Sequence, residues 1–473
     1  MNNLNNIKQK ISDNKIGIGL AIIAFVLYTF VILFNTPHDT LTGDEVFYYF
    51  QAQYLKSGEF VWFEHTSSVL YPLILSFFKS VLIILRMINA FFMSLSVFFL
   101  FKLSRLIMDD KYSILTTLLF LTNPETITLS SLLFTDTLFI FFVILSLYFY
   151  FRKITNDNFS ENKMDYIILG ILVGLASLTR VIGVYLVLFF LIMFFVVNNY
   201  KINLMLIKRY ILFLFPYIII TTLFFIFKSF NFIVMKINPT TIMFNKELLF
   251  NIIYYFNPLF CVLSLTALFY YTRQRLVNYL KYFVICYILL LMLLVNIIFP
   301  RYFFVAIPFL SLISLEFITH LKTRYYKIIG LLMIFVIIVS FAAKLPNIPQ
   351  LYSQNYYLAK DGCQDIKKFN ISCKNRLDKS ANEITTPYFS QEPLSNCIYA
   401  TRINIDKDYS KIYAAYIDDS GIISIGNYSV YHNDVYIPLK ESINLKKGEY
   451  NLTIDVQNDI LTGGIGQIMV CKN

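Results

Sequence analysis

Charged residues are scarce in this chain: Lys, Arg, Asp and Glu make up only 15% of its 473 residues, while apolar residues make up 57%. Because a soluble protein of this size needs far more charge to cover its surface, that class is excluded. The sequence also lacks an internal repeat, a Gly-rich phosphate loop and a His/Cys cluster with metal-ligand spacing. We therefore expect no cofactor and no metal site built from His and Cys.

The net charge of +11 is distributed unevenly along the chain. Residues 1–345 contain 27 Lys and Arg against 15 Asp and Glu, whereas residues 346–473 contain 13 against 14. The basic excess thus belongs to the apolar part, where short loops carry it, as they do in membrane proteins of fixed orientation. This distribution argues against nucleic acid as a partner.

The apolar residues form eleven runs that approach or exceed the length needed to cross a bilayer, which is about 20 residues. These predicted spans lie near residues 16–34, 81–103, 111–124, 130–151, 166–179, 181–198, 210–228, 249–271, 280–299, 302–320 and 327–345. The third and fifth are short, which leaves a range of ten to twelve. The first lacks a convincing cleavage site and is predicted to be an uncleaved helix.

The basic residues between the spans predict the orientation of the chain. With the N-terminus inside, the six inner segments hold three Lys or Arg each, eighteen of the 27, and the outer segments share nine. This bias predicts a cytoplasmic N-terminus, and an odd number of spans then places the C-terminus outside. We expect a multi-pass protein of the plasma membrane, surrounded by membrane lipids.

The C-terminal part has a different pattern. Residues 346–473 lose the long apolar runs and alternate as strands do, with turn signals such as Asp419-Ser-Gly421 between them. Four of the six cysteines lie here, which predicts two disulfides with three possible connectivities in an extracytoplasmic domain. These four are Cys363, Cys373, Cys397 and Cys471. The predicted fold is an α-helical polytopic membrane domain, residues 1–345, followed by an external β-rich domain, residues 346–473.

The first outer loop, residues 35–80, contains the first candidates for chemistry. Thr42-Gly-Asp-Glu45 predicts a helix start with acidic residues in the first turn, and the following helix is expected to lie along the membrane surface. Adjacent residues on a helix point in different directions, so Asp44 and Glu45 are not expected to act as a matched pair. The alternative is that both carboxylates only cap the helix.

Other charged residues fall at the predicted outer ends of the spans. They are Glu125 after Asn123-Pro124, Asp136 in the fourth span, Arg180 between the fifth and sixth, and Arg301 at the start of the tenth. Ionisable groups at membrane depth cost several kcal/mol and are usually paired or functional. These residues predict a charged site at the lipid boundary, with mutual salt bridges as the alternative. Glu316, near an inner end, is expected to pair with a nearby Lys or Arg.

Several short motifs resemble those of one enzyme family, in the same order along the chain. They are Gly43-Asp44-Glu45 with Tyr48-Tyr49 and Ala52, Tyr71-Pro-Leu, Arg86-Met-Ile-Asn89, Phe134-Thr-Asp-Thr-Leu138, Gly174-Leu-Ala-Ser-Leu-Thr-Arg180 and Pro300-Arg-Tyr302. Together they resemble the GT-C glycosyltransferases, in particular the branch of dolichyl-phosphate-mannose protein mannosyltransferases and lipid A aminoarabinose transferases. The resemblance covers about residues 16–320. The Trp-Trp-Asp signature of oligosaccharyltransferases is absent.

The resemblance implies an activity and assigns roles to the candidates. Family members move a sugar from a polyprenyl-phosphate carrier, of dolichyl or undecaprenyl type, to an acceptor hydroxyl outside the cell or in the lumen. By resemblance Asp44 is the general base, and Arg180 or Arg301 binds the lipid phosphate. Asp136 and Glu125 would position the acceptor or the sugar. The acceptor is a glycan, a lipid or a protein, and no metal is required by this branch. An oxygen-ligand metal site formed by Asp44, Glu125 and Asp136 stays open as an alternative.

Two other functions fit the same composition. A transporter or lipid flippase would line a pathway with Arg180, Arg301 and Asp136, although no inverted repeat of broken spans is visible. A membrane scaffold or receptor would act through residues 346–473. In the second case activity would not depend on Asp44.

Overall fold

The computed structural model describes part of the chain. The described residues are 2–36, 40–42, 45–58, 68–155, 162–227, 258–294, 300–320, 355–357, 363–366, 368–373, 383–385, 388–389, 397–405, 409–417, 420–432, 439–458 and 464–471. The chain divides into two compact units. The first comprises residues 1–36, 55–59 and 67–348, and the second comprises residues 37–54, 60–66 and 349–473. Part of the first outer loop is therefore grouped with the C-terminal region.

The helices are as follows. They are α1 (Asn2–Asn35), α2 (Glu45–Ser57), α3 (Leu70–Ser76), α4 (Leu82–Ser104), α5 (Asp110–Leu121), α6 (Pro124–Ser131), α7 (Asp136–Thr155), α8 (Lys163–Thr179), α9 (Val184–Val197), α10 (Leu204–Phe227), α12 (Pro258–Phe269), α13 (Arg275–Leu294) and α14 (Ile307–Thr319). Two 3-10 helices, η1 (Val181–Gly183) and η4 (Pro300–Ala306), precede α9 and α14.

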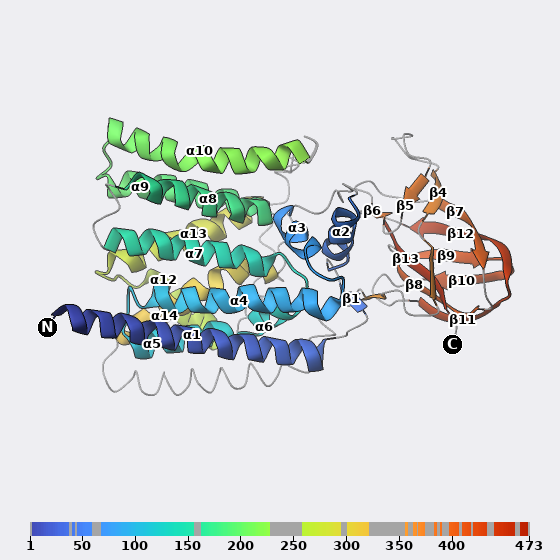
Figure 1. Ribbon diagram of the computed structural model, residues 1–473, viewed down its shortest axis with the longest axis horizontal. Helices are drawn as coiled ribbons and strands as arrows, with labels where there is room; N and C mark the ends of the chain where they lie inside the picture. The colour runs from blue at the N-terminus through green and yellow to red at the C-terminus, as the bar shows by residue number, and fades with distance from the viewer. Residues whose placement is uncertain are drawn as a thin grey trace. The chain divides into compact units, whose positions relative to one another are not determined.

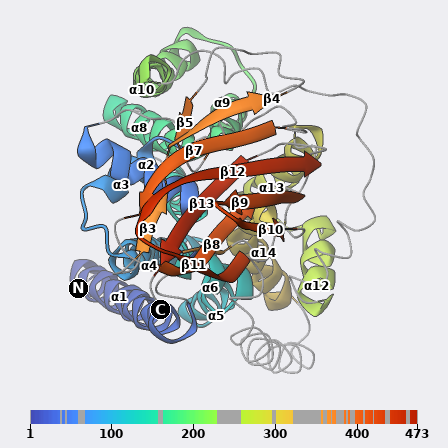
Figure 2. The ribbon, with the colours of Figure 1, turned by 90° about the vertical axis from the view of Figure 1, so that its right-hand side faces the viewer.

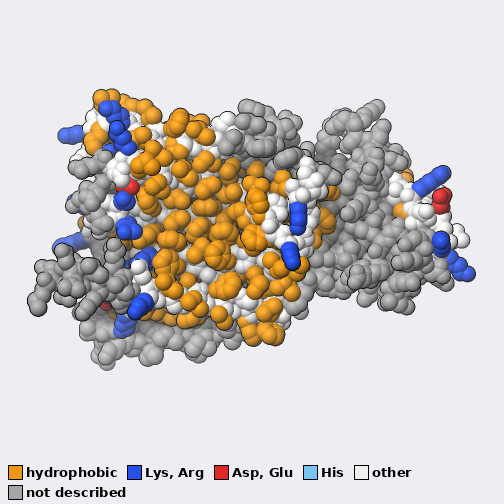
Figure 3. Space-filling view, viewed as in Figure 1, with side chains coloured by type: hydrophobic (Ala, Val, Ile, Leu, Met, Phe, Trp, Pro, Cys, Tyr) orange, Lys and Arg blue, Asp and Glu red, His pale blue; other side chains and the backbone are white. Residues whose placement is uncertain are grey.

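The long helices of the first unit form a layered bundle. Helices α1, α4, α7, α8 and α10 lie side by side in that order (Figure 1). Apolar side chains cover the visible face of the bundle, and Lys and Arg gather at the end where the N-terminus lies (Figure 3). On α1 the exposed side chains include Ile22 at 58%, Val26 at 61% and Phe34 at 71%. An apolar surface of this extent is stable against lipid rather than water, so the unit is a polytopic membrane domain.

Within the described residues, five helices are long and apolar enough to cross a membrane, judged by length and composition. They span Asn14–Asn35, Leu82–Ser104, Asp136–Thr155, Leu204–Thr222 and Tyr302–Thr319. The segment Val181–Val197 is apolar but shorter. The prediction of eleven spans therefore stays a prediction, and its last span, 327–345, lies outside the described residues.

The fourth predicted span, 130–151, is not one helix. Helix α6 ends at Ser131, Leu132 is extended with φ −118° and ψ 163°, and α7 begins at Asp136. The break is not visible in the hydropathy because the residues around it remain apolar and fully packed. It places Asp136 at the first position of a new helix, where the helix dipole favours a carboxylate.

Two glycines determine how closely α8 and α10 approach. Gly170 and Gly174 lie one turn apart, in a small-xxx-small pattern typical of membrane helix contacts. A Cβ at Gly170 would lie 2.2 Å from the Phe213 carbonyl oxygen and 2.7 Å from Pro216 Cγ. A Cβ at Gly174 would lie 3.1 Å from Ile220. The backbones of the two helices are in contact because neither glycine has a side chain.

The described strands are β1 (Thr40–Thr42), β2 (Asn355–Tyr357), β3 (Cys363–Ile366), β4 (Lys368–Cys373), β5 (Glu383–Thr385), β6 (Tyr388–Phe389), β7 (Cys397–Ile405), β8 (Tyr409–Ile417), β9 (Ser420–Ile425), β10 (Tyr428–His432), β11 (Leu439–Leu445), β12 (Gly448–Asn458) and β13 (Gly464–Cys471). One sheet has the order β10-β9-β12-β7-β4-β5, and another has the order β11-β8-β13-β3 with β6 beside β13. Figure 2 shows the strands of the first sheet lying across those of the second. All pairings are antiparallel.

Alternating residues give the first sheet one apolar face. Leu452 and Ile454 of β12 lie opposite Ile425 and Ile423 of β9, and all four are at most 1% exposed. This alternation is the two-residue period expected of a half-buried strand. The buried face explains why the residues between them in the sequence are polar.

The first outer loop pairs with the C-terminal region. Strand β1 is antiparallel to β2, with Thr40 opposite Tyr357 and Thr42 opposite Asn355. Leu41, at the centre of β1, is fully buried. Strand β2 in turn contacts β8 and β13. The residues that directly precede Asp44 in the sequence are thereby attached to the β-rich region.

The glycine contact between α8 and α10 is testable. We expect Gly170→Ala to lower the thermal unfolding midpoint in detergent, because overpacking typically costs about 1–3 kcal/mol and here the obstacle is backbone. Gly19→Ala in α1 is the matched control, since a Cβ there meets nothing within 4 Å. Equal midpoints for the two variants would show that α8 and α10 are not in backbone contact.

Candidate functional site

Two of the charged candidates form an ion pair in the first unit. The Arg180 guanidinium donates from Nη1 to Asp136 Oδ1. The Asp136 side chain is 3% exposed and that of Arg180 is 15% exposed. The carboxylate is thus buried, whereas the Arg180 side chain remains partly exposed. Mutual pairing, one alternative from the sequence, accounts for Asp136 but leaves donors of Arg180 available to an anion.

Asn89 holds the turn from which Asp136 begins its helix. This residue lies in α4, is fully buried, and donates from Nδ2 to the carbonyl oxygens of Leu132 and of Phe134, the latter at 3.0 Å. Both carbonyls belong to the break between α6 and α7. The amide replaces the helical hydrogen bonds that the break removes. The sequence motif included Asn89, but its role became visible only with the fold.

Arg180 is positioned by the end of α8. It is the C-cap residue, with extended φ −150° and ψ 135°, and its backbone N–H donates to Ala176 O at 3.1 Å. The chain then turns through η1, where a Cβ on Gly183 would lie 2.7 Å from the Ser177 backbone. Only glycine allows this close approach. The guanidinium therefore projects from a tightly folded corner between two helices.

An aromatic residue lies against the guanidinium. The Arg180 Cζ is 5.2 Å from the centroid of the Tyr302 ring, within cation–π range. Tyr287 of α13 donates its hydroxyl hydrogen to the Tyr302 carbonyl oxygen at 2.8 Å, which ties η4 to α13. The sequence motif Pro300-Arg-Tyr302 contained Tyr302 without assigning it a role, and nothing distinguished Tyr287 among the 35 tyrosines.

Helix α6 and η4 bring the other candidates to this region. Asn123 caps α6 by accepting from the Glu125 N–H at 3.0 Å, Pro124 follows, and the Glu125 side chain is 7% exposed. Segment η4, which contains Arg301, contacts α6 and α7. The Arg301 side chain lies outside what the structure describes.

A further arginine lies in the same helix as Asn89. Arg86 is fully buried, one turn earlier in α4. Buried arginine within an apolar helix is rare and usually functional or paired. The sequence motif contained this residue without assigning it a role.

In the second unit, Asp44 itself lies outside the described residues, but the elements on either side of it are described. Strand β1 ends at Thr42 and α2 begins at Glu45, which is fully buried. The expected helix after Thr42 is therefore confirmed. Its buried face carries Glu45, Tyr48, Gln51 and Ala52. Burial raises the pKa of the neighbouring Tyr49 hydroxyl, which stays protonated at neutral pH.

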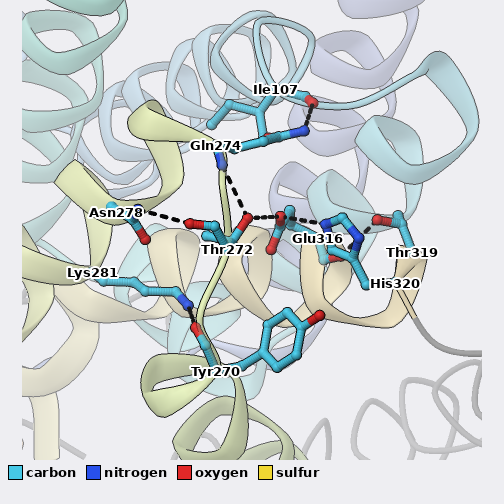
Figure 4. A network of polar contacts seen from close by, with 9 residues as sticks. All are labelled: Ile107, Tyr270, Thr272, Gln274, Asn278, Lys281, Glu316, Thr319 and His320. Atoms are coloured by element: carbon cyan, nitrogen blue, oxygen red, sulfur yellow. Dashed lines mark hydrogen bonds and ion pairs between the residues drawn. The ribbon is translucent and has the colours of Figure 1, made fainter.

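A second buried polar cluster lies where the α12–α13 turn meets α14 (Figure 4). Glu316, 1% exposed, accepts from Thr272 Oγ1 at 2.8 Å and pairs with His320 Nε2 at 2.9 Å. The expected Lys or Arg partner is thus wrong in part: Lys281 interacts with Glu316 electrostatically but donates to the Tyr270 carbonyl. The cluster provides hydrogen-bond partners for polar groups at the turn between α12 and α13, which is a structural role.

The remaining candidates concern metal and disulfides. Among the described residues, no group of three or more His, Cys, Asp or Glu could hold a metal ion. The backbones of all four C-terminal cysteines lie in strands, and their side chains are outside what the structure describes.

Residues 66–229 match the family model of dolichyl-phosphate-mannose-protein mannosyltransferase. The resemblance to this branch is thereby confirmed over a range that contains Arg86, Glu125, Asp136 and Arg180. The motifs around Asp44 and Arg301 lie outside the matched range. A search of curated proteins finds no match.

Parts of this chain also match solved structures of other proteins. ArnT from Cupriavidus metallidurans in the apo state matches with 14% identity and a TM-score of 0.48, over 65% of this chain and 60% of that one. The same protein bound to undecaprenyl phosphate matches with 16% identity and a TM-score of 0.49, over 67% and 62%. The S. cerevisiae Pmt1-Pmt2 complex bound to the sugar donor matches with 16% identity and a TM-score of 0.38, over 45% and 33%. The chain thus spans about three fifths of the length of ArnT.

The energetic coupling of Asp136 and Arg180 is testable by a double-mutant cycle. Asp136→Asn or Arg180→Gln alone leaves one buried charge without its partner, at a cost of about 3–5 kcal/mol. The double variant removes both charges and should cost less than the sum of the two. The measurement is thermal or denaturant unfolding in detergent.

The control is the more exposed pair formed by Arg105 and Asp110, whose side chains are 17% and 47% exposed. Neutralising Asp110 should change stability little, because exposed pairs contribute about 0–1 kcal/mol. Additive effects at Asp136 and Arg180 would mean that the two side chains are independent.

Proposed function

We propose that this chain is an integral membrane glycosyltransferase. It moves a sugar from a polyprenyl-phosphate carrier to an acceptor hydroxyl at the outer face of the membrane. The observation that carries the proposal is the partly exposed Arg180 side chain, paired with buried Asp136 inside the range that matches a mannosyltransferase family. A guanidinium at the membrane boundary suits a lipid phosphate, because it offers paired donors in a region of low dielectric.

The proposed reaction is a substitution at the anomeric carbon. The acceptor oxygen attacks that carbon and loses its proton to the Asp44 carboxylate. The bond from the anomeric carbon to the phosphate oxygen breaks, and its electron pair stays on the lipid phosphate. Arg180 and Arg301 offset the charge that grows on this leaving group. All atoms are supplied by donor, acceptor and base, so the step needs no co-reactant.

The buried carboxylates have supporting roles in this proposal. Asp136 keeps the Arg180 guanidinium oriented before the donor arrives, which lowers the entropic cost of binding. Glu125, at the start of α6, faces the acceptor or the sugar. Glu45 orients the segment that contains Asp44 and is not itself the base.

We also propose the arrangement in the membrane. The chain crosses the plasma membrane about eleven times, with the basic end of the bundle in the cytoplasm. Residues 346–473 then form an extracytoplasmic β-rich domain. The basic end in Figure 3 supports this orientation, since Lys and Arg prefer cytoplasmic loops.

The strand register favours one of the three disulfide connectivities. Cys373 lies opposite Cys397 between β4 and β7, and Cys363 lies opposite Cys471 between β3 and β13. Opposite Cα atoms in antiparallel ladders are about 4.5–5.5 Å apart. Disulfides bridge Cα atoms about 4.4–6.8 Å apart. We propose the bonds Cys373–Cys397 and Cys363–Cys471.

Peptide mapping of the non-reduced protein tests this connectivity. Two linked peptide pairs are expected, and Cys373→Ser should abolish the pair that contains Cys397 while leaving the other intact. Each bond lost should lower stability by about 2–4 kcal/mol. A link between the two pairs would contradict this connectivity, and four free thiols would contradict both the connectivity and the extracytoplasmic location.

The base assignment is tested with Asp44→Asn. This variant keeps the shape of the side chain but cannot accept a proton, so transfer should fall by about 10²–10⁴-fold. Binding of polyprenyl phosphate should be unchanged. Arg301→Ala should weaken lipid binding as well as slow transfer. The assay follows transfer from a polyprenyl-phosphate sugar beside binding of the bare lipid.

Glu45→Gln is the matched control because the adjacent helical position points about 100° away. Its effect on transfer should be milder than that of Asp44→Asn. Equal activity of Asp44→Asn and wild type would remove the base assignment. Transport of a lipid or solute across vesicles without any transfer would favour the flippase alternative.

A further inference from the structure

Gln51 is a buried amide with no hydrogen-bond partner. It lies in α2, its side chain is fully buried, and neither Nε2 nor Oε1 has a partner among the residues that the structure describes. Buried amides are almost always hydrogen-bonded, because leaving both ends unpaired sacrifices the bonds that water supplied. A group of this kind needs an explanation. One explanation is that the amide binds a ligand that is not part of the chain.

The position of Gln51 on α2 indicates which ligand. Residues Glu45, Tyr48 and Gln51 follow at intervals of three and share the buried side of the helix with Ala52. By contrast, Gln53 and Tyr54 on the same helix are half-exposed. The buried side of the helix thus includes the polar side chains of Glu45 and Gln51, whereas a surface helix usually buries apolar residues. Asp44 immediately precedes this face in the sequence.

An amide offers one acceptor and two donors, which is the complement of a sugar hydroxyl. We infer that Gln51 binds a hydroxyl of the sugar carried by the donor. The inference deepens the proposed function and rests on it. Gln51 is a specificity residue here: it contacts the transferred sugar and takes no part in proton transfer. In this proposal Gln51 makes no contact with the lipid phosphate.

The test compares two ligands that differ only in the sugar. Binding of polyprenyl-phosphate sugars is measured beside binding of bare polyprenyl phosphate, with mannose, glucose, N-acetylglucosamine and aminoarabinose as the sugars. Wild type should prefer at least one of the four over the bare lipid. Gln51→Met has nearly the same shape and removes both polar ends. It should weaken binding of that donor by roughly 10- to 100-fold, the value of one or two neutral hydrogen bonds. Binding of the bare lipid should not change.

Stability supplies a second readout that does not depend on the sugar. Gln51→Met should raise the thermal midpoint in the absence of ligand, since it removes two unpaired polar atoms from a buried site. A merely structural glutamine would give a lower midpoint. The matched control is Gln53→Met on the same helix, where donor binding should stay at the wild-type level.

The possible outcomes separate this inference from the proposed function. Equal weakening of donor and bare lipid, or of neither, overturns the role of Gln51. A lower midpoint overturns it as well, because it reveals a partner within the protein. Wild-type protein that binds none of the lipids would refute the proposed function. Wild type that binds all of them equally would leave phosphate binding in place and overturn the sugar contact.

Discussion

A carboxylate placed at membrane depth must find a partner, and the ion pair of Asp136 with Arg180 meets that requirement. Several neighbouring features of the helical unit position the two side chains of this pair. The break after α6 gives the carboxylate a helix N-terminus, and the Asn89 amide holds the break in place. The tight corner at Gly183 and the ring of Tyr302 orient the guanidinium. If Asp136 and Arg180 did not form this pair, most of these features would have no structural purpose.

Glu316 and Asp136, both buried carboxylates of the bundle, illustrate different uses of the same chemistry. Glu316 is bonded to a hydroxyl and an imidazole, and the helix turn beside it consumes the nearby donors. Asp136 is bonded to a guanidinium that has further donors, on a side chain that is partly exposed. Burial alone therefore does not mark a functional acid. What distinguishes Asp136 is the unused hydrogen-bonding capacity of its partner, Arg180.

Charge in apolar surroundings was the signal by which the sequence predicted Asp136, Arg180 and Glu125, since such residues are rare at membrane depth. The helix after Thr42 was also predictable from its acidic first turn. The break at Leu132 was not, because it depends on an amide 43 residues earlier in the chain. Gln51 carries no charge and belongs to no motif, so it became a candidate only when the structure showed that its side chain is buried. Tyr302 needed the fold, because its contact with Arg180 joins segments more than a hundred residues apart.

The ladder of β1 with β2 has a consequence for how the protein is made. Thr40 is synthesised early, but its partner Tyr357 leaves the ribosome more than three hundred residues later. While the intervening helices are inserted, the backbone groups of β1 that later bond to β2 do not yet have that partner. Contacts of such long range form late. The ladder of β1 with β2 therefore forms only after residue 357 has been made, so an unfinished chain lacks this link between the first outer loop and the C-terminal region.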